Sequence, residues 1–101
     1  MPGFSVERRL TSTSERLRRA RTELADVSEQ LALARHDADD ARTAALVQGG
    51  VAKRESTAAT RNAERLQKVH AQLTAEVADL SRRQDELLDR LPPTRPSRAR
   101  S

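Results

Sequence analysis

The chain has no cysteine, a single aromatic residue (Phe4), and no apolar run near the roughly 20 residues that a membrane-spanning helix requires. The absence of cysteine excludes a disulfide framework, a thiolate metal site and a cysteine nucleophile. The N-terminal stretch MPGFSVERRL lacks the apolar core of a signal peptide. We therefore expect a cytoplasmic protein with no membrane partner, and 101 residues set one domain as the ceiling.

Apolar residues make up only 36% of the chain and charged residues 34%, whereas a globular domain is about 45–50% apolar. Such a composition cannot build a thick core, but it can bury one narrow stripe along a helix, as coiled coils do. Two of the three glycines stand together at Gly49-Gly50, in the middle of an otherwise helical pattern.

An apolar residue recurs every seven positions along the chain, which predicts a coiled coil. This first stripe consists of Leu10, Leu17, Leu24, Leu31, Ala38, Ala45, Ala52, Ala59, Leu66, Leu73, Leu80 and Leu87. A second stripe lies three residues later in the first half, at Val6, Thr13, Ala20, Val27, Ala34 and Ala41. In the second half it lies four residues later, at Ser56, Ala63, His70, Val77, Gln84 and Leu91.

The reversed spacing is a mirror about Gly49-Gly50, and a mirror is what an antiparallel hairpin requires. Residues whose numbers sum to 97, such as 17 and 80, should then face each other. Glycine tolerates the left-handed backbone that ends a helix, so Gly49 and Gly50 are predicted to form the bend.

The fold class predicted is therefore all-α, an antiparallel coiled-coil helical hairpin with disordered termini. We expect a disordered segment at 1–4, a hairpin over 5–91 (helix 5–48, bend 49–50, helix 51–91) and a disordered basic tail at 92–101. Ser5 is expected to cap the first helix, with Ser12 as the alternative start. Pro92 is expected to end the second helix.

The seam is uneven, because leucine fills the end near the termini and alanine fills the end near the bend. The leucine layers should supply most of the stability. Polar layers are predicted where Thr13 meets Gln84 and where Val27 meets His70, and polar seam residues fix register at some cost in stability. We interpret His70 as such a structural residue rather than as a catalytic group or a metal ligand.

The net charge of +4 lies near the termini. The tail, with Arg95, Arg98 and Arg100, contains no acid, and such a segment attracts the phosphates of nucleic acids. Acids interleave the arginines elsewhere, and aromatic residues for base stacking are missing. Arginine excess is also typical of coding in a GC-rich genome. Nucleic acid or a nucleoprotein is therefore the alternative partner, and a protein is the favoured one.

One flank of the predicted hairpin brings like charges together, which does not stabilise a hairpin. The predicted neighbours are Arg9 with Arg90, Arg16 with Arg83, and Glu23 with Glu76, and Asp37 and Glu55 lie nearer the bend. The flank is thus positive near the termini and negative toward the bend. This polarity predicts an antiparallel dimer of hairpins, a four-helix assembly, or docking on a partner helix of similar polarity.

The stretch HDADDA places three carboxylates, Asp37, Asp39 and Asp40, close to the bend. His36 and Asp40 have the i, i+4 spacing of metal ligands, but two ligands make a poor site, so we expect a solvated acidic patch and no metal. The motif Asp37-x-x-Asp40-Ala41 resembles the acidic tip of Gre- and DksA-type transcription factors. Those factors insert a helical hairpin into RNA polymerase, and the resemblance implies that Asp37 and Asp40 act near its catalytic magnesium.

The segments SERLRRARTELADVSEQLA, DDARTAAL and QDELLDRL resemble small two-helix proteins of GC-rich actinobacteria, over about residues 5–91. That resemblance implies a source and a fold but no activity. A thin hairpin lacks an enclosed pocket, so we expect no enzyme, no catalytic residue and no cofactor. The predicted function is a coiled-coil interaction module: a scaffold, adaptor or assembly subunit. The alternative is a regulator of transcription or translation that docks on RNA polymerase, the ribosome or nucleic acid.

Overall fold

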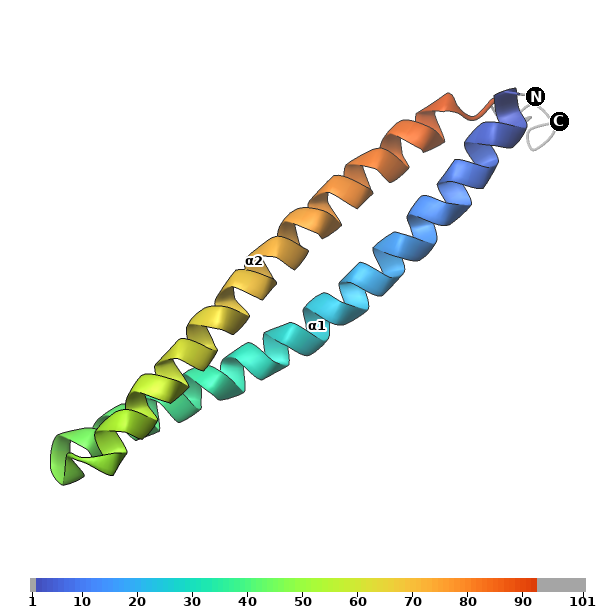
Figure 1. Cartoon of the computed structure of the whole chain (residues 1–101). Coiled ribbons are helices and arrows are strands. Elements are labelled where there is room, and N and C mark those ends of the chain that lie inside the picture. The colour runs from blue at the N-terminus through green and yellow to red at the C-terminus, as the bar shows by residue number, and fades with distance from the viewer. Residues whose placement is uncertain (1, 93–101) are drawn as a thin grey trace, which may run out of the picture.

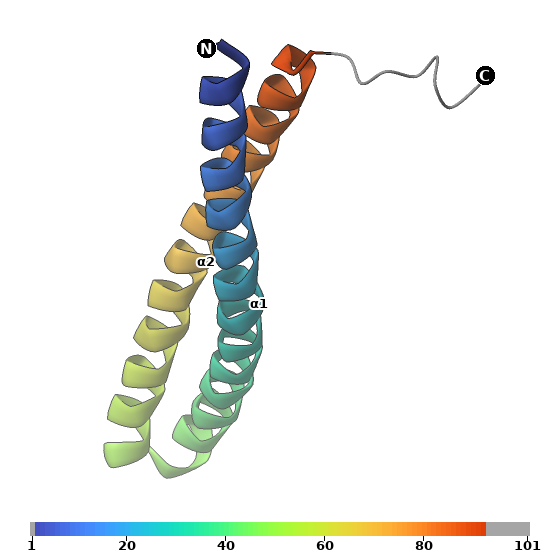
Figure 2. The same ribbon diagram turned by 90° about the vertical axis from the view of Figure 1, so that its right-hand side faces the viewer.

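The computed structural model describes the backbone of residues 2–92 and the side chains of residues 5–92. It consists of two helices, α1 (Pro2–Gln48) and α2 (Val51–Arg90), which run antiparallel side by side (Figures 1 and 2). The molecule is a rod of 75 × 28 × 14 Å. The prediction of an all-α helical hairpin is confirmed. The predicted tail arginines Arg95, Arg98 and Arg100 lie outside the described residues.

The first helix begins earlier than the sequence suggested. We expected residues 1–4 to be disordered and Ser5 to be the cap, but α1 starts at Pro2. Proline is favoured in the first turn, because its fixed φ suits a helix and its missing amide hydrogen has no partner there anyway. Ser5 and the alternative start Ser12 consequently lie inside α1.

The bend consists of the two glycines. Both have positive φ, 64° at Gly49 and 52° at Gly50, in the left-handed region that other residues seldom adopt. The Gly49 amide still donates to the Ala45 carbonyl (3.1 Å), which closes the last turn of α1. The Gly49 carbonyl accepts from the Ala52 amide (3.1 Å), so the first turn of α2 is built on the bend itself.

The second helix ends at Arg90, one residue before the predicted end. Leu91 has an extended backbone (φ −67°, ψ 143°), and its amide donates to the Leu88 carbonyl at 3.3 Å. Pro92 explains this end, because a proline disfavours the helical conformation of the residue before it.

The seam lies where the sequence predicted it, because every position of both stripes is buried or half-buried. Leu17, Ala20 and Leu80 form the buried core cluster, with Val77 packed against it. These residues are the predicted pairs 17/80 and 20/77, so the register is confirmed. Neither described helix has a segment that is apolar enough to cross a membrane.

The two polar layers satisfy their hydrogen bonds with serines beside the seam. The Gln84 Nε2 donates to the Ser14 Oγ (2.9 Å), and the His70 Nε2 lies 3.1 Å from the Ser28 Oγ. We expected Thr13 and Val27 as the partners, but each polar side chain reaches the next residue of α1. Among the described residues, no buried side-chain nitrogen or oxygen lacks a partner.

Candidate interaction surface

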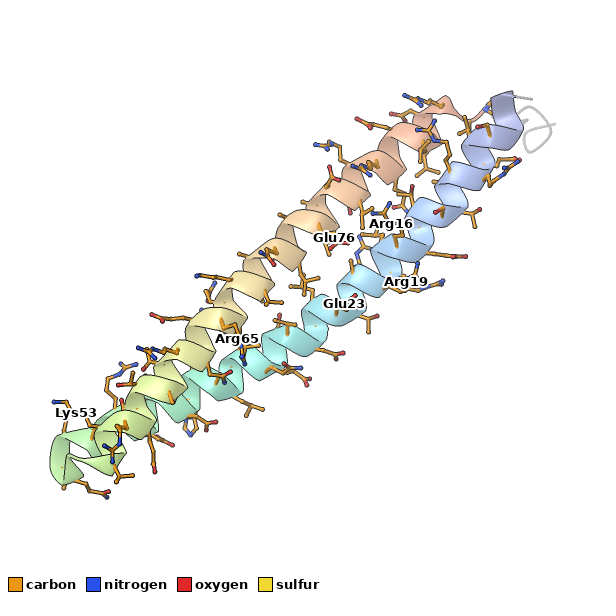
Figure 3. All side chains as sticks on the ribbon, in the orientation of Figure 1. Arg16, Arg19, Glu23, Lys53, Arg65 and Glu76 are labelled. Carbon is orange, nitrogen blue, oxygen red and sulfur yellow. The ribbon has the colours of Figure 1, made fainter. Side chains whose placement is uncertain are left out.

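One long side of the hairpin collects the residues that we call the charged flank. It consists of Arg9, Arg16, Glu23 and Asp37 of α1 and Glu55, Glu76, Arg83 and Arg90 of α2, all of them exposed. Figure 3 shows Arg16 and Glu23 on α1 and Glu76 on α2, directed toward the line between the two helices. The seam fixes this placement, since each residue lies directly beside a buried or half-buried stripe position.

The four arginines of the charged flank gather at the open end, where α1 begins and α2 ends. They line one groove of about 290 Å³ together with Ser12, Thr13, Glu86 and Leu87. The structure thus brings together Arg9 and Arg90, and Arg16 and Arg83, as the sequence predicted. Arg83 is also bound to Asp79, with its Nε 3.1 Å from the Asp79 Oδ2. Arg9, Arg16 and Arg90 have no carboxylate within ion-pair distance among the described residues.

The four carboxylates of the charged flank lie nearer the bend, and none of them forms an ion pair within the described part of the chain. Every ion pair there joins residues three or four apart on one helix. These pairs are His36–Asp40, Arg42–Asp39, Arg82–Asp79 and Arg83–Asp79. The described parts of the two helices are therefore held together by apolar packing and by hydrogen bonds rather than by ion pairs, and the flank charges other than Arg83 are available to another molecule.

The opposite flank differs, because its arginines bind neutral groups of the other helix. The Arg21 guanidinium donates to the Ser81 Oγ (3.3 Å), and the Arg35 guanidinium donates to the Gln67 Oε1. These contacts link the two helices without burying a charge. The segregation of arginines at the open end from carboxylates toward the bend belongs to the charged flank.

The acidic patch lies on α1 about two and a half to three and a half turns before the bend, and Asp37 also belongs to the charged flank. Asp37, Asp39 and Asp40 are exposed, and the His36 Nε2 lies 3.3 Å from the Asp40 Oδ2. Asp39 pairs with Arg42 at 3.4 Å. Within residues 5–92, no three His, Asp or Glu side chains come together as a set of metal ligands.

The bend end exposes three large aliphatic side chains that the sequence reasoning missed. Leu46 is 87% exposed, Val47 83% and Val51 61%. Leu33, farther along α1, is 67% exposed. The available signal was simple: none of these residues falls on either stripe, so the hairpin register leaves them outside the seam.

Comparison with known proteins adds no relative. No family model, no curated protein and no solved structure matches this chain. The resemblances to actinobacterial two-helix proteins and to Gre- and DksA-type hairpins therefore stay predictions.

Proposed function

We propose that the protein is a non-enzymatic interaction module that binds other helical proteins in the cytoplasm through its charged flank. One observation carries this proposal: the flank charges are exposed, segregated by sign along the rod, and unused by the hairpin itself except at Arg83. Complementary charge steers association and selects one orientation of the partner. A partner helix with acids near the open end and cations near the bend fits this surface.

The fold supports a scaffolding role more than a catalytic one. Catalysis generally needs preorganised groups in a site that excludes water, and the arginine groove lies along the surface of a rod only 14 Å thick in its smallest dimension. A two-helix rod instead presents a long face of the kind that helix-on-helix packing uses.

A second candidate, a regulator that inserts its hairpin into RNA polymerase or docks on the ribosome, draws support from the bend end. Leu46 and Val47 are exposed there, and Asp37 and Asp40 are exposed about two turns farther down α1. An apolar tip followed by carboxylates is suited to enter a protein channel. Two readouts separate the candidates. Docking on the ribosome depends on its RNA and is lost with nuclease, whereas insertion into a polymerase channel does not use the flank arginines and would survive in a flank variant.

The test uses the purified chain as bait, in its native form and as the double variant Arg16→Glu/Arg83→Glu. The matched control is Arg8→Glu/Arg61→Glu, which makes the same charge change at exposed positions outside the charged flank. We expect recovered helical proteins to survive nuclease treatment and to be lost with the flank variant alone. Equal recovery by all three baits would refute the charged flank as the binding surface. Recovery that vanishes with nuclease would favour the regulator.

A further inference from the structure

We infer that the partner the charged flank fits is a second copy of this chain, turned end for end and fully overlapped, so that Arg16 faces the second copy's Asp37. This inference rests on the proposed function, because it assigns an occupant to the same surface. It follows from the order of charges along the flank, which is complementary to itself in one register.

The charged flank and its neutral neighbours form layers that repeat every seven residues, about 10.5 Å apart. From the open end to the bend they are Arg9/Arg90, Arg16/Arg83, Glu23/Glu76, Gln30/Val69, Asp37/Asn62 and Ala44/Glu55. The first two layers each hold two cations, the third holds two carboxylates, the fourth is neutral, and the last two hold one carboxylate each.

Turning a second copy end for end, flank against flank, places α1 on α1 and α2 on α2, both antiparallel. At full overlap, Arg16 lies opposite the second copy's Asp37, and Arg90 lies opposite its Glu55. The Glu23/Glu76 layer then lies opposite the neutral fourth layer. Both arginine layers thus meet acid, and no two flank layers of like charge meet.

Sliding the copies by one layer destroys this match in either direction. Sliding one way sets the Glu23/Glu76 layer against itself, and sliding the other way sets it against the layer that holds Asp37. Sliding by two layers lets Arg16 meet Glu23 but leaves only four of the six layers in contact. Full overlap is the arrangement that joins charge matching with the largest buried face.

The exposed aliphatics support the same face. Leu33 and Val47 stand three residues after Gln30 and Ala44, so they lie on the flank side of α1. At full overlap Leu33 lies opposite the second copy's Arg19, whose aliphatic stem can cover it. One like-charge contact remains, because Asp26 lies near the second copy's Asp26. Asp26 is exposed, so water and salt screen this contact.

A charge swap tests the register in solution. We expect Arg16→Glu and Asp37→Arg each to weaken self-association at least tenfold in sedimentation equilibrium at low salt, and the double variant to restore it. Arg16 and Asp37 are 21 residues apart, about 31 Å along α1, so the rescue cannot arise inside one molecule. Arg8→Glu, on the outer face, is the control and should leave association unchanged.

A distance measurement identifies the register directly. Thr11 is exposed on the side away from the charged flank, and the absence of native cysteine permits a single label at Thr11→Cys. Full overlap places the two labels about 46 Å apart along the rod, a slide of one layer changes this to about 36 or 57 Å, and a slide of two layers to about 26 Å. Parallel copies would place them side by side.

The outcomes separate this inference from the proposed function. A chain that stays monomeric at every concentration, a double variant that fails to restore association, or a label distance of about 26, 36 or 57 Å would overturn the homodimer register. If Arg16→Glu/Arg83→Glu still abolishes capture of other helical proteins, the flank binds those proteins and the proposed function stands. If that variant captures as well as the native chain and the native chain is monomeric, both are wrong.

Discussion

Replacing both bend glycines with alanine should convert the hairpin into a long rod. Gly49 and Gly50 hold φ values of 64° and 52°, and a Cβ at either position would meet nothing within 4 Å. The cost of Gly49→Ala/Gly50→Ala in the hairpin is therefore backbone conformation alone, about 1–2 kcal/mol for each residue, and no less at Gly50, whose ψ of −118° lies outside the left-handed helical well.

The competing state is one continuous helix from Pro2 to Arg90, about 134 Å long. In that state each glycine-to-alanine change gains about 1 kcal/mol of helix propensity. The two effects add, so the balance shifts toward the rod by about 4–6 kcal/mol, on the order of a thousandfold or more. Two such rods would then pair and make the same seam contacts between chains, which is a domain swap.

Spin labels at Ser14→Cys and Ser81→Cys in one chain, diluted with unlabelled protein, measure the outcome. The native bend should give a distance on the order of 10–25 Å from the spacing of packed helices and the label arms. The double alanine variant should give about 100 Å, from 67 residues at 1.5 Å each. Gly49→Asn is the control, since asparagine tolerates the left-handed region. A short distance in the double alanine variant would show that the glycines do not set the bend.

Three further predictions concern the seam and its charges. Leu17→Ala should lower the free energy of unfolding in urea by about 3 kcal/mol, because the Leu17 side chain is 1% exposed. Leu33→Ala should change the free energy of unfolding by less than about 0.5 kcal/mol. Equal losses in the two variants would contradict the register. Gln84→Ala, which removes the donor to Ser14, should cost about 1 kcal/mol in the same assay, and the exposed Gln72→Ala should cost little. Raising NaCl from about 0.1 to 1 M should leave the urea midpoint of the monomer unchanged or higher, because no ion pair joins the described parts of the two helices. The same salt increase should dissociate the proposed dimer. A clear loss of monomer stability would show that ion pairs hold the hairpin.

The hairpin could be read from the sequence because two independent signals agree. The second stripe changes its spacing from three to four residues, and the change occurs at the only paired glycines. Apolar periodicity reports the buried face directly, so the pairing of Leu17 with Leu80 and of Ala20 with Val77 followed from residue numbers. The convergence of Arg9 and Arg90 followed in turn, since residues beside a known seam have known neighbours.

The details that escaped prediction depend on side-chain reach and on local backbone geometry. Ser14 and Ser28 were missed because the rule that facing residues have numbers summing to 97 matches backbone positions. The side chains of Gln84 and His70 extend to the next residue of α1. The predicted start of α1 was wrong. A serine cap and a proline in the first turn are both acceptable start signals, and the helix begins at Pro2.

The uneven seam has a consequence for how the chain folds and for whether its two helices would still associate if the bend were cleaved. Its strongest layers join residues far apart in the sequence, such as Leu17 and Leu80, and its weakest join near neighbours such as Ala45 and Ala52. Loop closure becomes costlier only slowly with length, so closing at Leu17–Leu80 costs about 0.5 kcal/mol more than closing at Leu31–Leu66. The leucine end can therefore serve as a folding nucleus that does not wait for the bend. The two glycines act as a tether that raises the effective concentration of one helix near the other, and two separated helices would keep the layers that recognise each other.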